Sequence, residues 1–345
     1  MKARRLVLGI LGAAGALVGG GALLGWYFSA PKYRGPVTDH FDGKHFHNVP
    51  PKHHPGFTDM VRWGLTRDKG PWDEWRDIAL APPPPKRVAG GELRVTWVNH
   101  ATLLIQTENV NILTDPIWSL RCSPVQWAGP KRHHQPGIRF EDLPPIDAVL
   151  ISHNHYDHLD LPTLDQLKRE HHPKMLAGLG NAAVVEGATA LDWGHSVELA
   201  PGVRIHAVPA RHFSSRGFVD RDANLWCGFV IETPHGGIYF AGDTGWGDHF
   251  AAIREHYGPM RLALLPIGAY RPEWFMSPVH VSPHDAIRAA RVLEAEVSIP
   301  MHYFTFDLGD DGQQEPADVL KRELAATPGP RFEVLLPGQT YSAMP

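Results

Sequence analysis

Residues 153–158 read His153-Asn154-His155-Tyr156-Asp157-His158, so three histidines and one aspartate lie within one short turn. Histidine nitrogens and carboxylate oxygens are ligands that suit Zn²⁺ and similar divalent ions. Residues 146–152 form an apolar run of strand length, so the cluster is expected where a buried strand ends. A strand end can hold a metal ion and leave room for substrate. The alternative is an exposed His-rich loop in a chain of 22 histidines. The buried strand before the cluster and the candidate ligands after it disfavour that alternative.

The composition is that of an ordinary globular protein: 345 residues, 43% hydrophobic and 20% charged. Such a chain can bury one large core or two modest ones. The net charge is -4, and no basic stripe appears beyond the extreme N-terminus, so a nucleic-acid partner is not expected. Two cysteines, Cys122 and Cys227, cannot make a disulfide framework, and their spacing does not decide whether they pair.

The N-terminus predicts a membrane segment. Lys2, Arg4 and Arg5 precede residues 6–30, which contain no charged residue, and about 20 apolar residues suffice to cross a bilayer core. The positive-inside rule then puts the rest of the chain outside the cytoplasm. Residues 1–30 are either a retained signal-anchor or a cleaved signal peptide. The length of the run and the poor cleavage site favour the anchor, whereas its glycines and weak hydrophobicity favour the signal peptide.

Residues 31–88 show no sustained periodicity and are rich in proline. They predict an irregular extension that packs on the main domain, with Trp63, Trp72 and Trp75 turned inward, because an exposed apolar tract is a liability. Four histidines in this segment lie on no recognisable element, and surface or packing roles are favoured over a metal cluster. They are His45, His47, His53 and His54.

The globular domain is expected at residues 89–345. Three short runs at residues 93–99, 102–107 and 110–114 are joined by tight turns, which predicts a meander of strands. Asp115 follows the third strand and is either a strand terminator or a carboxylate that orients a ligand histidine. His100, between the first two strands, is open to the same two interpretations.

Strands come in two groups with helices after each. This favours one α/β domain with two packed sheets and outer helices over two separate domains. Asp160 and Ser282 are the expected N-caps of two helices. Helices are expected at residues 160–170, 283–293 and 316–325. Further strands are expected at residues 203–209, 225–233, 237–241, 262–266, 297–300 and 331–336.

Three further residues, His212, Asp243 and His302, each follow a predicted strand directly. Any one of them alone would be an ordinary strand-end residue. Four separate strand ends that each offer a ligand indicate one shared metal site. Asp243 lies in Gly242-Asp243-Thr244-Gly245, and a carboxylate flanked by glycines can approach two ions and bridge them, an arrangement that suits two-metal hydrolases.

Taken in order, these motifs resemble the metallo-β-lactamase superfamily. Within it, the chain most resembles the branch of N-acyl-phosphatidylethanolamine-hydrolysing phospholipase D and its bacterial relatives. The resemblance covers nearly all of residues 38–340 and includes Phe41-Asp42-Gly43-Lys44. Two features depart from the branch: Asn99 stands where glycine is common, and residues 301–314 are idiosyncratic. The supporting stretches are residues 97–102, 113–116, 209–214, 225–229, 266–270, 274–276 and 280–281.

The resemblance implies a four-layer αββα sandwich, preceded by the membrane segment and the irregular extension. It also implies two divalent metal ions, expected to be Zn²⁺, that activate water for attack on phosphorus. One ion would be held by His153, His155 and His212, and the other by Asp157, His158 and His302, with Asp243 bridging both.

His280 is the candidate for a side chain that offsets charge on the phosphoryl group or orients the leaving group. The alternative is a histidine that only marks a helix entry. Asp243 and His280 are thus the expected catalytic residues, and Asp115 and His100 are expected to orient ligands. Four residues would line an apolar entrance for acyl chains or, alternatively, pack in the core. They are Tyr270, Trp274, Phe275 and Met276.

The function expected from this resemblance is a zinc-dependent phosphodiesterase of the phospholipase D type, acting on N-acyl-phosphatidylethanolamine or a related phospholipid. It would lie at the bacterial inner membrane with its catalytic domain on the periplasmic side, or free in the periplasm if residues 1–30 are cleaved. One alternative is a hydrolase of a soluble ester, lactone or phosphodiester. Another is a membrane-tethered, non-catalytic metal-binding protein. An iron redox centre is a further alternative, against which the all-histidine first ligand set argues. The oligomeric state stays open.

Overall fold

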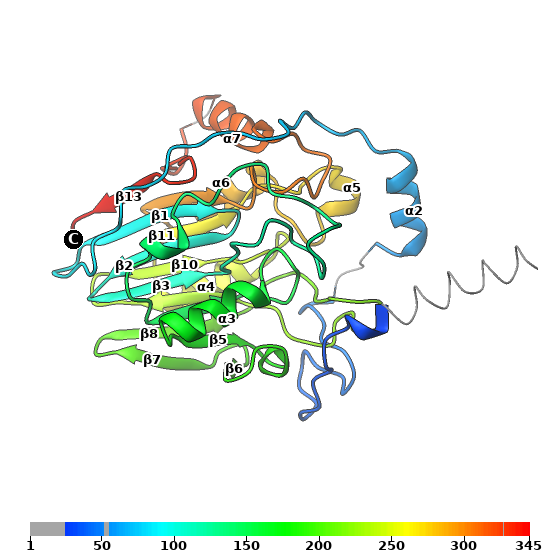
Figure 1. Ribbon diagram of the computed structural model, residues 1–345, viewed down its shortest axis with the longest axis horizontal. Helices are drawn as coiled ribbons and strands as arrows, with labels where there is room; N and C mark the ends of the chain where they lie inside the picture. Colours follow the sequence, from blue (N-terminus) through cyan, green and yellow to red (C-terminus); the bar gives the residue numbers. More distant parts are fainter. Residues whose placement is uncertain (1–24, 52–54, 327) are drawn as a thin grey trace, which may run out of the picture.

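The computed structural model describes residues 25–51, 55–326 and 328–345 (Figure 1). Its strands form two sheets. The first sheet has the order β13 (Thr340–Ala343), β1 (Leu93–Asn99), β2 (Thr102–Thr107), β3 (Val110–Thr114), β4 (Ala148–Ile151), β5 (Lys174–Gly178) and β6 (Thr189–Leu191). The second has the order β12 (Val297–Met301), β11 (Met260–Pro266), β10 (Gly237–Phe240), β9 (Gly228–Glu232), β8 (Val203–Val208) and β7 (Ser196–Ala200).

Alternation along the strands of the first sheet separates two apolar layers. In β1, Val95 and Trp97 enter a core that also contains Phe229 and Leu264 of the second sheet. The next residue, Val98, instead joins the outer layer of the first sheet. Because successive side chains of a strand point to opposite faces, this pattern means that the two sheets pack face to face.

Helices cover the two outer faces (Figure 1). On the first sheet, α3 (Leu161–Glu170) buries Leu164 and Leu167 against the outer apolar layer. On the second sheet, α4 (His249–Tyr257) and α6 (Pro283–Val292) contribute to the main core, and α7 (Glu315–Ala326) packs beside α6. Two short helices, α2 (Phe57–Leu65) and α5 (Glu273–Met276), lie at one end of the molecule, and two 3-10 turns occupy Phe140–Asp142 and Asn181–Ala183. The architecture is therefore a mixed α/β fold with two packed sheets and outer helices.

Strand directions explain why the polar strand ends meet. β3 and β4 run parallel in the first sheet. In the second sheet β8 and β10 are both antiparallel to β9, so they run the same way, and β10, β11 and β12 are parallel. The carboxyl ends of β8, β10 and β12 consequently lie at one edge of the second sheet.

Local signals predicted several elements well. β1, β2 and β3 form the expected meander with the expected bounds. Helix α6 begins after Ser282, whose hydroxyl accepts a hydrogen bond from Asp285 N at 3.2 Å. Asp160 stands at the N-cap of α3, but its carboxylate accepts hydrogen bonds from Ser119 Oγ and the Thr163 hydroxyl instead of capping the backbone.

Two strand predictions need correction. The predicted strand at residues 331–336 was wrong: Phe332 makes one isolated bridge to Ser298, and the closing strand is β13, which pairs with β1. Residues 225–227 are not part of β9, because their backbone turns toward the first sheet, where Leu225 N bonds Leu179 O and Cys227 N bonds Ser152 O. These three residues link the two sheets beside the ligand loop.

The N-terminal membrane prediction falls largely on residues 1–24, outside the described residues. Among the residues that the structure describes, no helix has the length and apolar character needed to cross a bilayer. Cys122 and Cys227 are both buried and are not joined to each other.

The N-terminal extension packs on the main body through Trp63 and Trp72, but it is not irregular throughout, because Phe57–Leu65 form helix α2. Trp63 stacks on Phe275 with ring centroids 4.9 Å apart, and its indole N–H donates to Asp310 at 3.1 Å. The Trp72 indole donates to Asp311 O at 2.9 Å. The prediction that Trp75 turns inward was wrong, because this side chain is exposed at the surface. His45 and His47 belong to none of the possible metal-binding groups among the described residues, and His53 and His54 lie outside that part of the chain.

Candidate metal centre

The seven predicted ligands converge at the common edge of the two sheets. The loop after β4 carries His153, His155, Asp157 and His158, whereas His212, Asp243 and His302 follow β8, β10 and β12. Their side chains form groups whose nitrogen and oxygen atoms lie within 4.8 Å of one another. The structure thus brings together residues that are far apart in the sequence.

The His153 group consists of His153, His155 and His212. His155 Nδ1 lies 2.8 Å from His153 Nε2 and 3.2 Å from His212 Nε2. Burial lowers the pKa of all three rings, to about 4 for His155. The three imidazoles are therefore neutral at pH 7, the form in which histidine ligates a metal.

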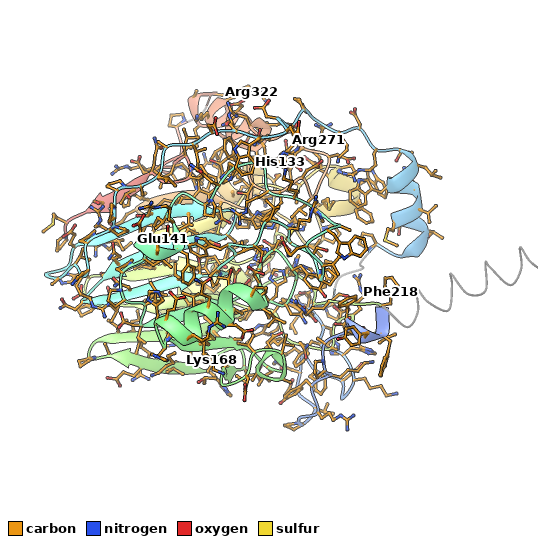
Figure 2. All side chains as sticks on the ribbon, in the orientation of Figure 1. His133, Glu141, Lys168, Phe218, Arg271 and Arg322 are labelled. Atoms are coloured by element: carbon orange, nitrogen blue, oxygen red, sulfur yellow. The ribbon has the colours of Figure 1, made fainter. Side chains whose placement is uncertain are left out.

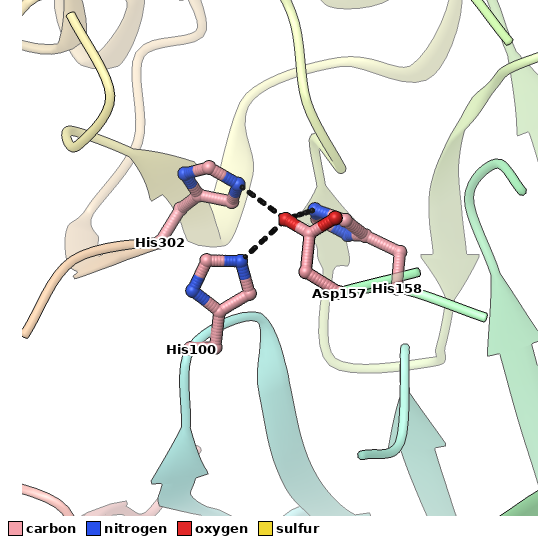
Figure 3. Close-up of side chains that lie close together, drawn as sticks. All are labelled: His100, Asp157, His158 and His302. Carbon is pink, nitrogen blue, oxygen red and sulfur yellow. Dashed lines mark hydrogen bonds and ion pairs between the residues drawn. The ribbon is translucent and has the colours of Figure 1, made fainter. Parts of the chain in front are cut away.

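The His302 group consists of Asp157, His158 and His302 (Figure 3). Asp157 Oδ2 lies 3.2 Å from His158 Nε2 and 3.4 Å from His302 Nε2. The same oxygen accepts a hydrogen bond from His100 Nε2 at 2.9 Å, so His100 lies beside this group and within the same cluster of possible ligands. His100 and His302 adopt positive φ values of 41° and 65°. Such backbone conformations cost non-glycine residues about 1–3 kcal/mol and are concentrated at functional sites.

Asp243 lies between the two groups. Its Oδ2 is 3.0 Å from His302 Nε2 and 3.2 Å from His158 Nε2, and it is 3.7 Å from His212 Nε2. The preceding Gly242 has a φ of +59°, and a Cβ there would approach the Ser152 Cβ to 2.6 Å. Only glycine at this position lets the carboxylate come so close to the ligand loop.

Asp115 controls the protonation of one histidine in each group. Its Oδ2 accepts hydrogen bonds from His158 Nδ1 and from the Ser152 hydroxyl, both at 2.6 Å. Because the one hydroxyl hydrogen of Ser152 is thus used, His153 Nδ1 must donate to Ser152 Oγ, at 2.9 Å. Both rings carry a hydrogen on Nδ1, so each would present the lone pair of a neutral Nε2 to a metal ion bound in the centre. A carboxylate behind a histidine plays this part in many metal sites.

The electrostatics of the centre fit a divalent cation. Burial disfavours charge on His158 and His302, but the neighbouring carboxylates, Asp243 foremost, outweigh it and raise both pKa values, that of His302 to about 9. Burial likewise opposes the charge of Asp243, yet His158 and His302 hold its pKa low. Among the described residues Asp243 Oδ1 is buried without a hydrogen-bond donor. The buried carboxylates are stabilised by a positive charge close to them, which a bound divalent cation would supply. Imidazole nitrogens and carboxylate oxygens are also the ligands that suit zinc-like ions.

His280 faces the centre. Its Nδ1 lies 3.8 Å from Asp243 Oδ2, and burial lowers its pKa to about 4. Its ring lies 5.2 Å from that of His212 and 5.4 Å from that of His302. The side chain therefore points into the site, although the residue also precedes helix α6.

A cavity of about 750 Å³ opens onto this centre. Phe275 and Met276 line it beside Asp157, Asp243 and His302. Tyr270 and Trp274, which we expected in the same wall, lie elsewhere. The Tyr270 hydroxyl donates to Glu315 at 3.0 Å, and Trp274 is partly exposed beneath the guanidinium of Arg62.

Sequence reasoning missed several residues of the site. Met60 and Trp63 of the N-terminal extension line the cavity, as does Phe213, whose ring packs against His155 and His212. Arg216 is largely buried and donates to the carbonyls of Asn154 and Leu159, at 2.9 Å each, which braces the ligand loop. The adjacency of Phe213 and Arg216 to His212 was the one signal in the sequence that pointed to them.

Comparison with known proteins agrees with this geometry. A family model described as a beta-lactamase superfamily domain matches residues 110–303. An uncharacterized protein of Mycobacterium tuberculosis is 38% identical over 292 residues, which cover 81% of this chain and 77% of that protein. N-acyl-phosphatidylethanolamine-hydrolyzing phospholipase D 1 of Caenorhabditis elegans is 37% identical over 250 residues, which cover 68% and 70% of the two chains.

The solved structure of Igni18, a metallo hydrolase of Ignicoccus hospitalis, shares the fold with a TM-score of 0.56 and 23% identity. The match covers 73% of this chain and 98% of that one. Together with the family match and the identity to its relatives, the fold leads to one assignment: the chain belongs to the metallo-β-lactamase superfamily and is a metal-dependent hydrolase.

Proposed function

We propose that the protein binds two zinc ions and is a phosphodiesterase of the phospholipase D type, with N-acyl-phosphatidylethanolamine or a related phospholipid as substrate. The observation that carries this proposal is the union of a polar floor and an apolar wall in one cavity. Asp157, Asp243 and His302 form the floor, and side chains of the N-terminal extension and α5 form the wall. A phospholipid is divided in the same way, into a polar phosphodiester and long apolar acyl chains.

The surroundings of the cavity suit a lipid surface. Met60 and Phe218 line the cavity and are exposed, Phe218 by 77%, and Leu65 at the end of α2 is 82% exposed. Figure 2 shows Phe218 at the end of the molecule where α2 lies. Apolar side chains gathered around a cavity mouth are typical of surfaces that meet a membrane or another apolar partner.

The predicted membrane segment supports the same proposal. Its last residues pack on the loop that carries Phe218: Ala30 N donates to the buried Asp220 carboxylate at 2.7 Å, and Phe218 N donates to Gly25 O at 3.3 Å. A segment anchored in a bilayer would thus hold the cavity mouth close to it. The relative from Caenorhabditis elegans, named for hydrolysis of N-acyl-phosphatidylethanolamine, adds sequence support.

The His153 group and the His302 group would each hold one ion, with Asp243 between them. Bound zinc would polarise a phosphoryl oxygen and lower the pKa of water. The neutral His280 ring carries one N–H, which can donate a hydrogen bond to a phosphoryl or leaving-group oxygen in the cavity. The Phe213 ring packs against both His155 and His212 and would limit their movement. Breaking the bond between phosphorus and the head-group oxygen would release phosphatidic acid and an N-acylethanolamine.

The test compares full-length protein in mixed micelles with the Asp243→Asn variant. Metal analysis should give about two zinc ions per chain, and mass spectrometry should detect phosphatidic acid from N-acyl-phosphatidylethanolamine for the wild type alone. Two ions without lipid turnover, but with hydrolysis of a soluble phosphodiester or ester, would favour the soluble-substrate alternative. No bound metal would refute the dinuclear proposal.

A further inference from the structure

A tight turn in the N-terminal extension packs two aromatic rings against the stretch of chain that leads to His212. The Asp42 carboxylate accepts hydrogen bonds from the N–H groups of Lys44 and His45, each at 2.7 Å, and Gly43 takes a φ of +95°. This closes the chain so that Phe41 and Phe46 form a bridge and are both buried. They pack in one cluster with Ala210, Leu225 and Trp226, close to where β8 delivers His212.

Asn48 follows this turn, and its side-chain amide hydrogen-bonds both the N–H and the C=O of the His212 backbone. Its Nδ2 donates to His212 O at 3.0 Å, and its Oδ1 accepts from His212 N at 3.1 Å. The Trp226 indole N–H donates to the same Oδ1 at 3.1 Å. Asn48 is buried, so this side chain supplies hydrogen bonds that water does not reach.

His212 is otherwise held by its ring. Its Nδ1 donates to Val279 O at 3.0 Å, which leaves the Nε2 lone pair for the centre. That bond sets which nitrogen is free, but it does not fix the backbone of His212. The two bonds from Asn48 fix the backbone itself, and with it the position of Nε2 relative to His155.

We propose that Asn48 is a positioning residue for one half of the metal centre, the His153 group, and that the N-terminal extension therefore completes the site rather than only covering it. The proposal rests on the proposed two-ion function. It goes beyond that function because it makes the binding of one ion depend on a residue outside the domain that the family model matches. The hydrogen bonds of Asn48 described above reach His212 and Trp226, and neither residue belongs to the His302 group. Loss of Asn48 should consequently weaken the binding of one ion and leave the binding of the other unchanged.

The experiment measures the two metal affinities separately, by competition of the full-length protein with a chromophoric chelator for zinc. His212→Ala and His302→Ala identify which binding step belongs to which group. His212→Ala should abolish one of the two binding steps. Asn48→Leu should lower the zinc affinity of that same step roughly 10–100-fold, the usual effect of losing a residue that orients a ligand, and leave the affinity of the other step unchanged. Asn48→Asp, which keeps the acceptor for His212 N but loses the donor to His212 O, should act in the same direction.

Trp226→Phe is the control, because it removes the indole N–H that is shared between Asn48 Oδ1 and Ala210 O and keeps both bonds from Asn48 to His212. Its metal affinities should equal those of the wild type. A second readout needs no metal: hydrogen exchange of the His212 amide in the chelated protein should become faster in Asn48→Leu and not in Trp226→Phe. Unchanged affinities and unchanged exchange in Asn48→Leu would overturn the proposal, as would equal weakening of both steps. Two ions without lipid turnover in the wild type would refute the lipid substrate and leave the Asn48 proposal standing.

Discussion

Replacement of Asp115 by asparagine tests the hydrogen-bond chain behind the ligands. In the wild type, one carboxylate oxygen accepts from His158 Nδ1 and from Ser152, and Ser152 in turn accepts from His153 Nδ1. Asparagine keeps the shape but can place an NH₂ group where that oxygen was. The amide would then donate to His158 Nδ1, and the hydrogen of that ring would move to Nε2, the atom that faces the centre.

The expected loss follows from the number of ligands affected. His158 belongs to the His302 group and His153 to the His153 group, so each half loses one correctly presented nitrogen. Loss of such an orienting partner weakens a metal by about 10–100-fold, or about 1.4–2.7 kcal/mol. With both ions affected, the loaded protein should lose about 3–5 kcal/mol of stability at a fixed free-metal concentration.

Chelator competition and urea unfolding at controlled free zinc measure the two quantities. Asp160→Asn is the control, since Asp160 is also a buried carboxylate but bonds Ser119 and Thr163 and no candidate ligand. If Asp115→Asn binds both ions as tightly as the wild type, the argument from tautomers fails. Weakening of only one ion would show that the chain through Ser152 does not reach His153.

Three further predictions use other groups. In the metal-free protein the His302 pKa is about 9, compared with about 6.5 in an unfolded chain. The protonated ring therefore adds about 3 kcal/mol to the free energy of unfolding below pH 6.5, and this contribution is lost as pH rises through 9. Urea unfolding with chelator should show this loss in the wild type and not in His302→Gln. Burial raises the Asp311 pKa to about 6, so this carboxyl should cost about 3 kcal/mol of stability as pH rises from 4 to 6. Asp311→Asn should flatten that slope, and equal slopes in the two proteins would contradict the assignment. Trp63→Ala removes the ring that stacks on Phe275 in the cavity wall and should raise KM roughly tenfold for a long-chain lipid and little for a soluble phosphodiester; equal effects on both would show that the wall does not bind acyl chains.

The strands that local pattern predicted are those whose ends are marked in their own sequence. β1, β2 and β3 are short apolar runs bounded by turn residues, and their bounds were correct. The same logic located the candidate ligands, because each lies in a loop or turn that follows an apolar strand directly. The convergence of His212 and His302 then required only that their strands run in the same direction.

The remaining features depend on partners that the local sequence does not name. β13 is a strand because β1 has an open edge for it, whereas residues 331–336 leave β12 after a single bridge. The sequence predicted Tyr270 in the aromatic wall of the cavity, but its hydroxyl donates a hydrogen bond to Glu315 instead. Asn48 carries no recognisable pattern, since its importance lies in the backbone of a residue that follows much later in the chain.

The spread of the ligands along the chain also bears on how the protein is made. The loop of residues 153–158 emerges early in synthesis, but His302 emerges only with β12, which pairs in parallel with β11. Parallel pairing joins distant segments and forms late compared with local turns. A growing chain can therefore offer the loop of residues 153–158 but no finished centre, so an ion would take its final place only after folding is nearly complete. The metal present wherever folding ends, rather than where the chain is translated, would then decide which ion the protein carries.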